Sequence, residues 1–446
     1  MSYNTLDLTV LILAKHEAEN LHQLLPSIHK TLAGTGIRYD VLVVVDRDDE
    51  ATATVSREHG AKVTAQPAPG YGAAFGHGLQ TATGEYIAAI DADLSHNPDV
   101  ILRLWEARSG AGLVIASRYV PGGRADMPLS RQILSRSLNA FVRHGLSLGV
   151  RDVSSGFRLY RRDAISNVEL RAQHFDVLEE VLIQITADGW AIREIPFHYR
   201  PRVHGRSHVR LLAFGWSFLV SFVSMWQLRN SVFSADYDER AFNSLIPLQR
   251  YWQRTRHELI LRFQQRGCRT LDIGCGSSRI ILSLPHIIGL DIQLKKLRRI
   301  QARAPRVVQG TITSLPFADG AFEAVICSQV IEHVPRELVS FAELNRVISP
   351  GGTLTIGTPD YDTWTWPLLE WAYGIVHPGG YVDEHINHYT AASLAQELTD
   401  NGFEILDKAY VGGGELIYQA RKVALAASLT APVAVARLAM MPHDVV

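Results

Sequence analysis

The chain has few cysteines, almost no net charge and no leader-like start, and each absence removes a class of protein. Its three cysteines in 446 residues are too few and too scattered for a disulfide framework, and they form no Cys-x-x-Cys metal motif. A formal net charge of −1 gives no general attraction to nucleic acid, so no nucleic-acid partner is expected. The first residues, MSYNTLDLTV, lack the basic and apolar regions of a secretory signal. Together these features predict a reducing, cytoplasmic location.

Two sets of alternating strand-like and helix-like segments predict two α/β domains. Helical runs such as Ala18–Leu32 and Pro98–Arg108 separate the strand candidates of the first set, which are Leu8–Leu13, Tyr39–Val45, Ala61–Ala65, Glu85–Ile90 and Gly112–Ser117. This alternation predicts a parallel sheet with helices on both faces. The strand candidates of the second set are Thr270–Ile273, Ile287–Leu290, Ala324–Cys327 and Gly352–Ile356, with a closing hairpin of Phe403–Ala409 and Glu415–Ala420.

The domain boundary is expected in the polar segment Ser231–Leu245. The expected divisions are a first domain (1–210), an apolar helix (211–230), a linker with a helical part (231–268), a second domain (269–422) and an apolar tail (423–446).

The segment Leu211–Leu228 contains no charged residue. As a helix it would measure about 27 Å at 1.5 Å per residue, just short of the ~30 Å hydrocarbon core of a bilayer. Its serines are predicted on one side and its large apolar residues on the other; the two groups are Ser217, Ser221 and Ser224, and Phe218, Leu219, Phe222, Val223 and Trp226. This sidedness favours a helix lying in the membrane interface. A spanning helix and a helix packed on protein stay open.

Acidic residues follow three apolar strands of the first domain. Asp91 and Asp93 come directly after Glu85–Ile90, and two carboxylates so placed can reach one divalent cation, which also binds substrate phosphates. Glu17 and Asp46 follow two earlier strands, and open parallel sheets bind ligands outside these strand ends. Both can accept hydrogen bonds from a base or a ribose. The alternative for Asp-x-Asp alone is a solvated turn.

Seven motifs over residues 7–210 resemble those of family 2 glycosyltransferases, in the group of dolichyl-phosphate mannosyltransferases and related polyprenyl-phosphate sugar transferases. In order, they are LILAKHEAEN, VVVDRDD, PGYGAAFGHG, DADLSH, ASRYVPGG, DVSSGFRLYRR and EIPFHYRPRVHGRS. The resemblance implies a GT-A fold, an inverting transfer and a divalent cation, Mg²⁺ or Mn²⁺. By position, it implies that Glu17 and Asp46 hold the nucleotide and that Asp91 and Asp93 hold the metal and the diphosphate. It also implies that phosphate groups meet Arg118, Arg131, Ser155 and Arg202.

Arginines are frequent in the second half of this domain. An ionised lipid phosphate needs no strong base to attack a sugar, but it needs cations that bring two anions together, and arginine suits bidentate phosphate contacts. Some of the candidates are surface residues; the set is Arg118, Arg124, Arg131, Arg136, Arg158, Arg200, Arg202 and Arg206. We expect a GDP- or UDP-linked sugar donor and a lipid phosphate acceptor at the cytoplasmic face of a membrane.

Two alternatives to this interpretation stay open. A soluble hydroxyl acceptor would need a base such as Asp152, and the domain could instead be a non-catalytic docking module. Departures from the family pattern leave the base and the sugar open; they are Leu13 for proline, Lys15 for an aromatic residue, Arg47 for an acid or small polar residue, Ser95 for glutamine and His208 for lysine.

The second domain opens with a strand, a Gly-x-Gly turn and a helix start in LDIGCGSSRI. Gly274 and Gly276 permit a tight turn and a close ligand approach. Asp291 ends the next strand, where an acid can hold ribose hydroxyls. A dinucleotide site would need a third glycine where Arg279 stands, whereas the charged methionine end of S-adenosylmethionine (SAM) can meet Asp272. The residues therefore favour SAM.

Further motifs between about Asp236 and Lys422 resemble class I SAM-dependent methyltransferases, which implies a Rossmann-like fold. They are LDIGCGSS, GLD, GTITSLPFADGAFEAV, SQVIEHV, ELNRVISPGG and a closing GF element. Thr311 stands where the family usually has an acid that contacts adenine, and Glu323 replaces a usual aspartate.

Methyl transfer needs an acceptor held in line and sometimes a base. The candidates are Glu332, His333, His385 and His388. His385 and His388, with Asp383 and Glu384, could instead bind a metal, and a structural histidine pair is a third possibility. The aromatic stretch Trp364–Tyr373 lines an acceptor pocket or packs in the core. The whole chain is predicted to be bifunctional: a sugar transferase whose second half methylates an oxygen on a related glycan or small molecule.

Overall fold

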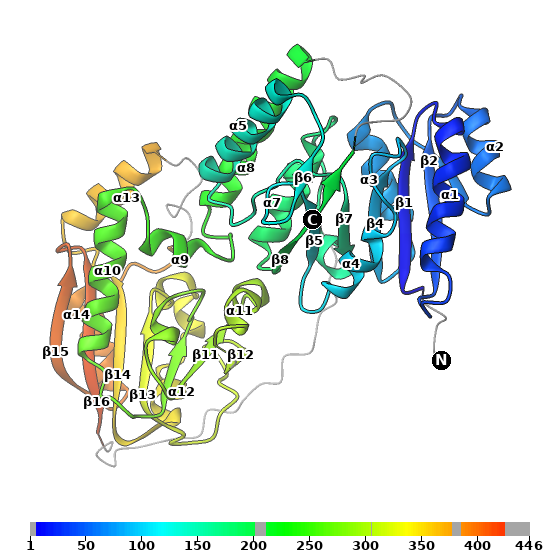
Figure 1. Ribbon diagram of the computed structural model, residues 1–446. Helices are drawn as coiled ribbons and strands as arrows, with labels where there is room; N and C mark the ends of the chain where they lie inside the picture. Colours follow the sequence, from blue (N-terminus) through cyan, green and yellow to red (C-terminus); the bar gives the residue numbers. More distant parts are fainter. Residues whose placement is uncertain (1–5, 201–210, 305, 377–384, 424–446) are drawn as a thin grey trace.

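The computed structural model describes residues 6–200, 211–304, 306–376 and 385–423. It contains two seven-stranded sheets, one in each half of the chain, with helices packed around each (Figure 1). The predicted α/β fold class with two sheets is confirmed. The motif residues Arg202, Arg206, His208, Asp383 and Glu384 and the tail from residue 424 lie outside the described residues.

The strands of the first sheet lie in the order β3-β2-β1-β4-β7-β5-β8. All the predicted strands are present, but the prediction of an all-parallel sheet is wrong, because β7 runs antiparallel between β4 and β5. The sequence of β7, RLYR, is polar at both ends, so it did not stand out as a strand, although Arg158 is fully buried. The bounds are β1 Leu8–Ala14, β2 Tyr39–Val45, β3 Lys62–Ala65, β4 Tyr86–Asp91, β5 Leu113–Ser117, β7 Arg158–Arg161 and β8 Ile192–Pro196.

Helices cover both faces of the first sheet, as predicted. On one face Leu21 and Ile101 belong to a core shared by α1, α2 and α4; on the other, Phe75 and Val181 belong to a core shared by α3, α5 and α7. Burial on both faces explains the continuous apolar runs of the parallel strands. The bounds are α1 Ala18–Leu32, α2 Glu50–Glu58, α3 Tyr71–Thr81, α4 Val100–Glu106, α5 Leu129–Gly145, α6 Arg162–Ile165 and α7 Val177–Ala187, and a small sheet pairs β6 Arg124–Ala125 with β9 His198–Tyr199.

Helix α8 (Leu211–Asn230) packs against α5 and α7. Where its side chains are described, residues from both predicted sides contact the first domain. Phe222, predicted on the apolar side, packs into the first domain with its ring 4.9 Å from that of Phe141. Ser221, predicted on the polar side, points inward because Asp176 accepts its hydrogen bond at 2.5 Å. In the described parts of the chain, no helix combines the length and the apolar character needed to cross a membrane.

The second sheet has the order β12-β11-β10-β13-β14-β16-β15, and it is parallel except for β16. The antiparallel pairing of β15 with β16 confirms the predicted closing hairpin. The strands are β10 Thr270–Ile273, β11 Ile287–Asp291, β12 Val307–Gln309, β13 Phe322–Ser328, β14 Ile348–Pro359, β15 Phe403–Val411 and β16 Glu415–Lys422. The helices are α9 Tyr237–Phe242, α10 Pro247–Arg262, α11 Leu294–Gln301, α12 Phe341–Val347, α13 Thr365–Val376 and α14 Ala391–Asp400, with 3₁₀ turns η1 Ile280–Leu282, η2 Ile331–His333 and η3 Arg336–Leu338.

Residues 229–240, which we call the joint, connect the two sheets through buried side chains and do not form a loose linker. Arg229 is 1% exposed, and its guanidinium donates to both carboxylate oxygens of Asp236 at 2.6 and 2.7 Å. It also donates to the carbonyl oxygens of Leu146 and Ser147 in the first domain. Burial raises the pKa of Asp236, but the hydrogen bonds and charge of Arg229 outweigh burial and lower this pKa to about 2. The joint therefore rests on a desolvated ion pair.

Contacts between the two halves continue beside the joint. The Ala235 N–H donates to the carbonyl oxygen of Ala187 at the end of α7. From the second half, Arg298 donates to the carbonyl oxygen of Asp188 at 2.8 Å and lies 4.0 Å above the ring of Trp190. These contacts fix α11 of the second half against the turn that follows α7.

Candidate functional site

Acidic residues follow three neighbouring parallel strands of the first sheet, as predicted. Strand β1 lies between β2 and β4, and the pairing register aligns the last residues of the three strands. Glu17 and Asp46 therefore follow the ends of β1 and β2, and Asp91 ends β4, at one edge of the sheet. Because open α/β sheets bind ligands outside these ends, we call this edge the strand-end site.

Asp91 is the last residue of β4, and Asp93 lies in the turn that follows it. The Asp91 side chain is 40% exposed, whereas Asp93 is buried and its Oδ1 accepts the Ser95 N–H at 3.0 Å. His96 lies against Asp91, with Nε2 3.6 Å from Oδ2. The Ser95 hydroxyl is buried and lacks a hydrogen-bond partner among the described residues. These oxygen atoms, at the carboxyl-terminal ends of the parallel strands, suit a hard divalent cation.

The two acids predicted to hold a nucleotide already have protein partners. Lys15 Nζ lies 2.6 Å from Asp46 Oδ2, and Gln66 donates a hydrogen bond to the other carboxylate oxygen. Asn20 donates to Glu17 Oε2 at 2.5 Å. Lys15 departs from the family pattern, and its contact explains what this lysine does in the fold, because its ammonium group neutralises the Asp46 carboxylate.

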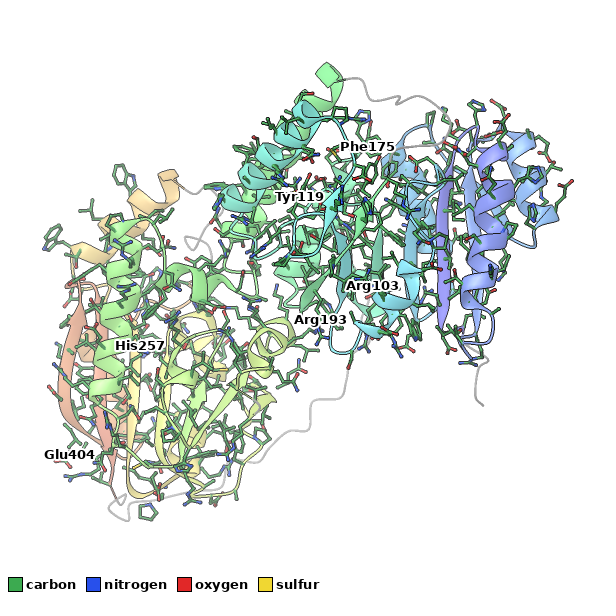
Figure 2. All side chains as sticks on the ribbon, viewed as in Figure 1. Arg103, Tyr119, Phe175, Arg193, His257 and Glu404 are labelled. Carbon is green, nitrogen blue, oxygen red and sulfur yellow. The ribbon has the colours of Figure 1, made fainter. Side chains whose placement is uncertain are left out.

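The turn that opens α3 reaches the same edge. A side chain at Gly72 would lie 2.1 Å from the Ala172 carbonyl oxygen, so this position requires glycine. The Tyr71 ring stacks on Phe175 at 4.3 Å, and Phe175 lies at the surface of the first domain (Figure 2). A Cβ at Gly156 would lie 3.5 Å from Asp91 Oδ1 and 3.7 Å from the Tyr71 hydroxyl. The α3 turn and the loop before β7 therefore meet at Asp91.

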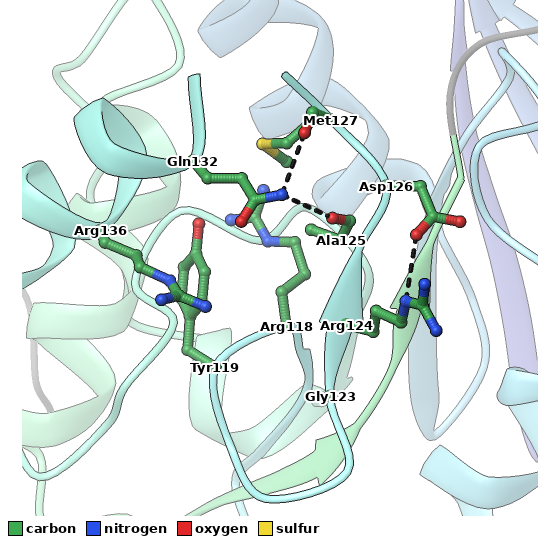
Figure 3. Close-up of a pocket in the computed structure, with 9 residues that line it drawn as sticks. All are labelled: Arg118, Tyr119, Gly123, Arg124, Ala125, Asp126, Met127, Gln132 and Arg136. Atoms are coloured by element: carbon green, nitrogen blue, oxygen red, sulfur yellow. Dashed lines mark hydrogen bonds and ion pairs between the residues drawn. The ribbon is translucent and has the colours of Figure 1, made fainter. Parts of the chain in front are cut away.

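A cavity of about 380 Å³ lies between the loop after β5 and the start of α5 (Figure 3). The Arg118 and Arg136 guanidinium carbons lie 5.1 and 5.8 Å from the centre of the Tyr119 ring. The lining is formed by Arg118, Tyr119, Gly123, Arg124, Ala125, Asp126, Met127, Gln132 and Arg136. Three guanidinium groups around one cavity suit a ligand that carries phosphate. We call it the arginine cavity.

The segment around β9 connects the arginine cavity with the strand-end site. The Arg124 N–H donates to the carbonyl oxygen of Phe197, and the Arg200 N–H donates to that of Ser95 at 3.3 Å. The ring of Tyr199 lies 6.3 Å from that of His96. The two features are therefore neighbouring parts of one surface.

Arg118 is held by Asp152. Its Nε and Nη2 donate to the two oxygens of this fully buried carboxylate at 2.8 and 2.7 Å. Burial lowers the pKa of Arg118, but the hydrogen bonds and charge of Asp152 outweigh burial and raise this pKa above its usual range. Asp152, the base required by a soluble hydroxyl acceptor, is therefore committed to an ion pair.

The other residues predicted to contact phosphate differ in their exposure and in their hydrogen-bond partners. Arg131 is exposed near the start of α5, whereas Arg202 lies outside the described residues. The hydroxyl of Ser155 donates to the Ala116 carbonyl oxygen at 2.7 Å. Arg158, one of the wider set of candidate arginines, is fully buried and donates to three backbone carbonyl oxygens, those of Val153, Ser155 and Leu178, so it does not face a ligand.

The Gly-x-Gly turn of the second domain lies beside Asp272. Gly274 and Gly276 have φ values of 66° and 52°, which glycine adopts without strain. Asp272 is buried, and its Oδ2 has no hydrogen-bond partner among the described residues. Burial, followed by the charges of Asp291 and Asp238, raises the pKa of Asp272 to about 8. An orphaned buried carboxylate fits a ligand that brings a cation, such as the methionine end of SAM.

Two more acids surround the turn. Asp291 accepts the Gly276 N–H at 2.8 Å, so it shapes the turn in addition to its predicted contact with ribose. Asp238 in α9 accepts the Ser277 N–H at 3.0 Å and lies 3.4 Å from Lys296 Nζ. Sequence reasoning missed Asp238, whose only signal was an acid in a short helix before the domain. The hydroxyl of Thr311 lies 3.2 Å from that of Thr313, outside this cluster of contacts.

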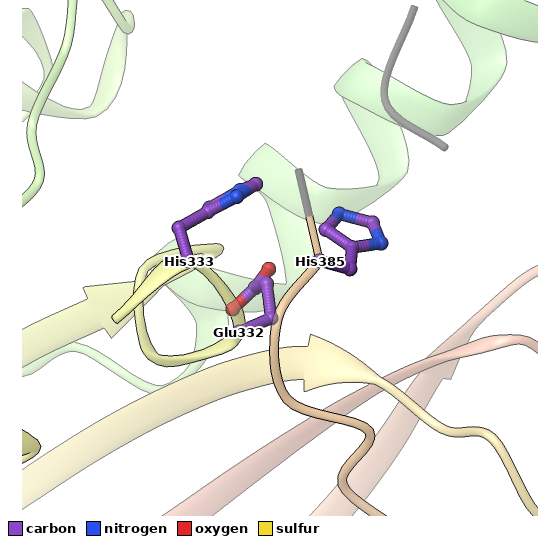
Figure 4. Close-up of side chains that lie close together, drawn as sticks. All are labelled: Glu332, His333 and His385. Atoms are coloured by element: carbon purple, nitrogen blue, oxygen red, sulfur yellow. The ribbon is translucent and has the colours of Figure 1, made fainter. Parts of the chain in front are cut away.

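Glu332 and His333, on η2, lie together with His385 (Figure 4). One potential ligand atom from each lies within 4.8 Å of the others. Burial raises the pKa of Glu332 to about 8, and burial followed by the charges of His333 and His388 lowers the pKa of His385 to about 4. The alternative site of His385 and His388 with Asp383 and Glu384 stays a prediction, because the two acids lie outside the described residues; His388 stacks on Tyr361 at 4.0 Å. We call Glu332, His333 and His385 the triad.

The aromatic stretch around the start of α13 is largely at the surface where its side chains are described. Trp364 and Trp371 are 77% and 65% exposed, which excludes simple core packing for them. Trp366 instead lies beside the triad, with its ring 5.9 Å from that of His385. This part of the stretch can line an acceptor pocket.

Family profiles match both halves of the chain. The profile of glycosyl transferase family 2 matches residues 9–168, and a methyltransferase domain profile matches residues 271–356. The strand-end site lies within the first match, and the Gly-x-Gly turn lies within the second.

Two curated relatives match the first half. A dolichol-phosphate mannosyltransferase of Pyrococcus furiosus is 31% identical over 211 residues, covering 45% of this chain and 59% of the relative. A polyprenol monophosphomannose synthase of Mycolicibacterium smegmatis is 31% identical over 218 residues, covering 44% of this chain and 79% of the relative. The chain thus spans somewhat more than half the length of the first relative.

Solved structures also resemble each half. Glucosyl-3-phosphoglycerate synthase of Mycobacterium tuberculosis, in complex with Mn²⁺, UDP and glucosyl-3-phosphoglycerate, is 20% identical with a TM-score of 0.41 and covers 49% of this chain and 80% of its own. A SAM-dependent methyltransferase of Thermotoga maritima, described as a possible histamine N-methyltransferase, is 19% identical with a TM-score of 0.35 and covers 42% of this chain and 94% of its own.

Proposed function

Because the chain belongs to the family 2 glycosyltransferases and also carries a methyltransferase domain, we propose that it is a bifunctional transferase. The first domain transfers a sugar from a GDP- or UDP-linked donor to a polyprenyl phosphate, with inversion at the sugar carbon. The second domain methylates an oxygen on that product or a related glycan. The observation that carries the first part is the arginine cavity beside helix α5, which exposes large apolar side chains.

The cavity chemistry favours a phosphate acceptor over a hydroxyl. A phosphate arrives ionised, so its oxygen can attack the sugar carbon without a base, while guanidinium groups offset the repulsion between two anionic substrates. Arg124 and Arg136 line the cavity beside the Arg118–Asp152 pair. A hydroxyl acceptor would need Asp152 as base, and using it would break this buried ion pair, which is costly.

Helix α5 favours a lipid as the carrier of that phosphate. Gln132 and Arg136 line the cavity, and the same helix exposes Ile133 and Leu134 by 58% and 65%. Leu129 and Phe141 are also exposed. An apolar helix surface beside a cationic cavity is the arrangement expected of a protein that lies on a membrane while binding a lipid phosphate. We place the protein peripherally, on the cytoplasmic face.

The donor would bind at the strand-end site. Asp91 and Asp93 would hold a divalent cation, Mg²⁺ or Mn²⁺, which when bound neutralises the charge that develops on the nucleoside diphosphate leaving group. Glu17 and Asp46 would hold base and ribose, with Lys15 competing for Asp46. In the second domain, SAM supplies an electrophilic methyl group, Asp272 would bind its ammonium group, and the glycines Gly274 and Gly276 would let the backbone of the turn approach it closely.

Labelled GDP- and UDP-sugars, polyprenyl phosphate in vesicles, and Mg²⁺ or Mn²⁺ test the first activity. Asp93→Ala should lower transfer at least about 100-fold, in line with the loss of a group that stabilises developing charge. Asp99→Ala, which removes an exposed acid in the same domain, is the matched control and should keep activity.

Three outcomes would contradict the proposal. Equal turnover for the Asp93 variant and the parent would support a docking module. Label in a soluble hydroxyl acceptor, with none in the lipid, would support the alternative acceptor. If labelled SAM gives no label in the glycosylated lipid, the proposed link between the two domains is wrong.

A further inference from the structure

The triad is assembled by the fold from two distant segments. Glu332 and His333 come from η2, which follows β13, and His385 comes from the segment before α14. The Glu332 carbonyl oxygen accepts the N–H groups of Ile386 and Asn387 at 2.8 and 3.1 Å. These backbone hydrogen bonds clamp the two segments together, so the three side chains keep one arrangement before any ligand binds.

Glu332 presents a buried acceptor oxygen that no described donor satisfies. Its side chain is fully buried, and Oε1 lacks a hydrogen-bond partner among the described residues. Its Oε2 accepts a long hydrogen bond, 3.3 Å, from the Thr358 hydroxyl. Burying a carboxylate oxygen without a donor is unfavourable, and a cation between this oxygen and the two imidazoles would remove that cost.

His385 has the outer contacts that orient histidine ligands. Its Nδ1 lies 2.9 Å from the Tyr361 hydroxyl and 3.1 Å from Glu370 Oε1. In metal sites, a carboxylate on one ring nitrogen fixes the ring so that the other nitrogen faces the ion. In Figure 4 the three side chains surround a common space.

We propose that Glu332, His333 and His385 bind a divalent transition-metal ion through one carboxylate oxygen and two imidazole nitrogens. Imidazole-containing donor sets suit zinc, copper, nickel and iron, whereas Mg²⁺ and Ca²⁺ take oxygen ligands. Three protein ligands leave coordination positions open for a further ligand.

The position of the triad indicates what that further ligand is. Val330, two residues before Glu332, packs over the Gly-x-Gly turn, since a Cβ at Gly274 would lie 2.2 Å from its side chain. The ion would therefore sit near the methyl donor and hold the oxygen of the methyl acceptor, a role that rests on the proposed methyltransferase activity. The acceptor hydroxyl releases its proton to solvent, its oxygen bonds the methyl carbon, and the carbon–sulfur bond breaks with its electrons on sulfur.

Metal binding can be measured without any substrate, which separates this inference from the proposed function. Full-length chelator-treated protein carrying Asp93→Ala, which disables the cation site proposed for the first domain, is titrated with Co²⁺ and followed by visible absorption. We expect one tightly bound Co²⁺ with an absorption spectrum of nitrogen and oxygen ligands, displaced by Zn²⁺.

Variants of the triad decide the result. In the same background, Glu332→Gln and His385→Ala should each weaken Co²⁺ binding by more than about 100-fold, and Glu370→Gln by about 10- to 100-fold. His286→Gln changes an exposed histidine of the same domain and should leave binding unchanged. Glu332→Gln also removes a buried carboxylate, so it should fold well. No Co²⁺ retained by the parent, or equal affinity in Glu332→Gln and the parent, would overturn the proposal.

Discussion

At the scale of single residues, the Asp272 carboxylate destabilises the folded protein when no ligand is bound. Its folded-state pKa of about 8 lies above the ordinary value of 3.8, so the folded state binds this proton more tightly than the unfolded chain. The contribution of this group to the free energy of unfolding is therefore greatest below pH about 4. It falls as the pH rises toward 8, by about 1.4 kcal/mol per pH unit.

Asp272→Asn should remove this pH dependence. Without SAM, the melting temperature of the variant should rise steadily relative to that of the parent between pH 5 and pH 8. With SAM, the variant should bind roughly 10- to 100-fold more weakly, because a charged hydrogen bond contributes about 1.5–3 kcal/mol. Calorimetry and isothermal titration measure the two effects, and Asp362→Asn, an exposed acid of the same domain, is the control. Parallel melting curves across this pH range would contradict the assignment.

Residue identities were predictable where a motif fixes them to a strand end. Asp91, Asp272 and the glycine turn all lie where the sequence places them, because a strand followed by a turn leaves little freedom. The partners of these residues were not predictable. Asp238 and His385 reach their sites from segments distant in sequence, and a single sequence carries no signal for such pairing.

At the scale of elements, α5 presents two different surfaces. Its polar residues line the arginine cavity, while Ile133 and Leu134 face solvent. If this surface contacts a membrane, Ile133→Gln with Leu134→Gln should lower vesicle binding about tenfold or more, given that burying one such side chain contributes about 1.5–3 kcal/mol.

The melting temperature of this double variant should not change, because substitutions at exposed positions usually stay within about 0.5 kcal/mol. Flotation with vesicles measures the binding. Leu245→Gln, at a residue that is 93% exposed outside α5, is the matched control. Equal flotation of the double variant and the parent would argue that α5 does not touch lipid.

Strands and helices were predicted well where apolar periodicity is strong. Helix α1 and strand β2 have the predicted bounds, since their buried positions repeat regularly. Strand β7 was missed because its core position is occupied by Arg158, whose charge is compensated by backbone carbonyls that no sequence pattern reveals. Both predicted sides of α8 contact the first domain, because the Ser221 hydroxyl donates to Asp176 while Phe222 packs into the core, and the sequence does not show which side a helix will turn toward its neighbours.

At the scale of the whole molecule, the joint couples the two domains. Asp236→Asn would leave the buried Arg229 charge without its partner, and breaking a buried pair in this way costs about 3–5 kcal/mol. In the parent, S-adenosylhomocysteine at 100 times its dissociation constant should stabilise the folded state by about 2.7 kcal/mol and raise the unfolding temperature of both domains.

In Asp236→Asn the same ligand should raise the unfolding temperature of the second domain only. Scanning calorimetry with and without ligand resolves this. Glu239→Gln is the control, since the Glu239 carboxylate accepts hydrogen bonds from Arg299 and Arg303 of the second domain. If the first domain of the parent melts at the same temperature with and without ligand, the joint does not transmit binding.

The ion pair of the joint also decides where the polypeptide can be divided. A cut after Asn230 would strand Arg229 in the first piece and leave Asp236 in the second, so neither piece would keep its share of the pair. A cut after Phe242 would keep Arg229 and Asp236 together but take Asp238 away from the Gly-x-Gly turn. Either cut therefore separates residues that contact each other in the intact chain. The two domains are for this reason harder to separate or exchange than their separate family matches imply.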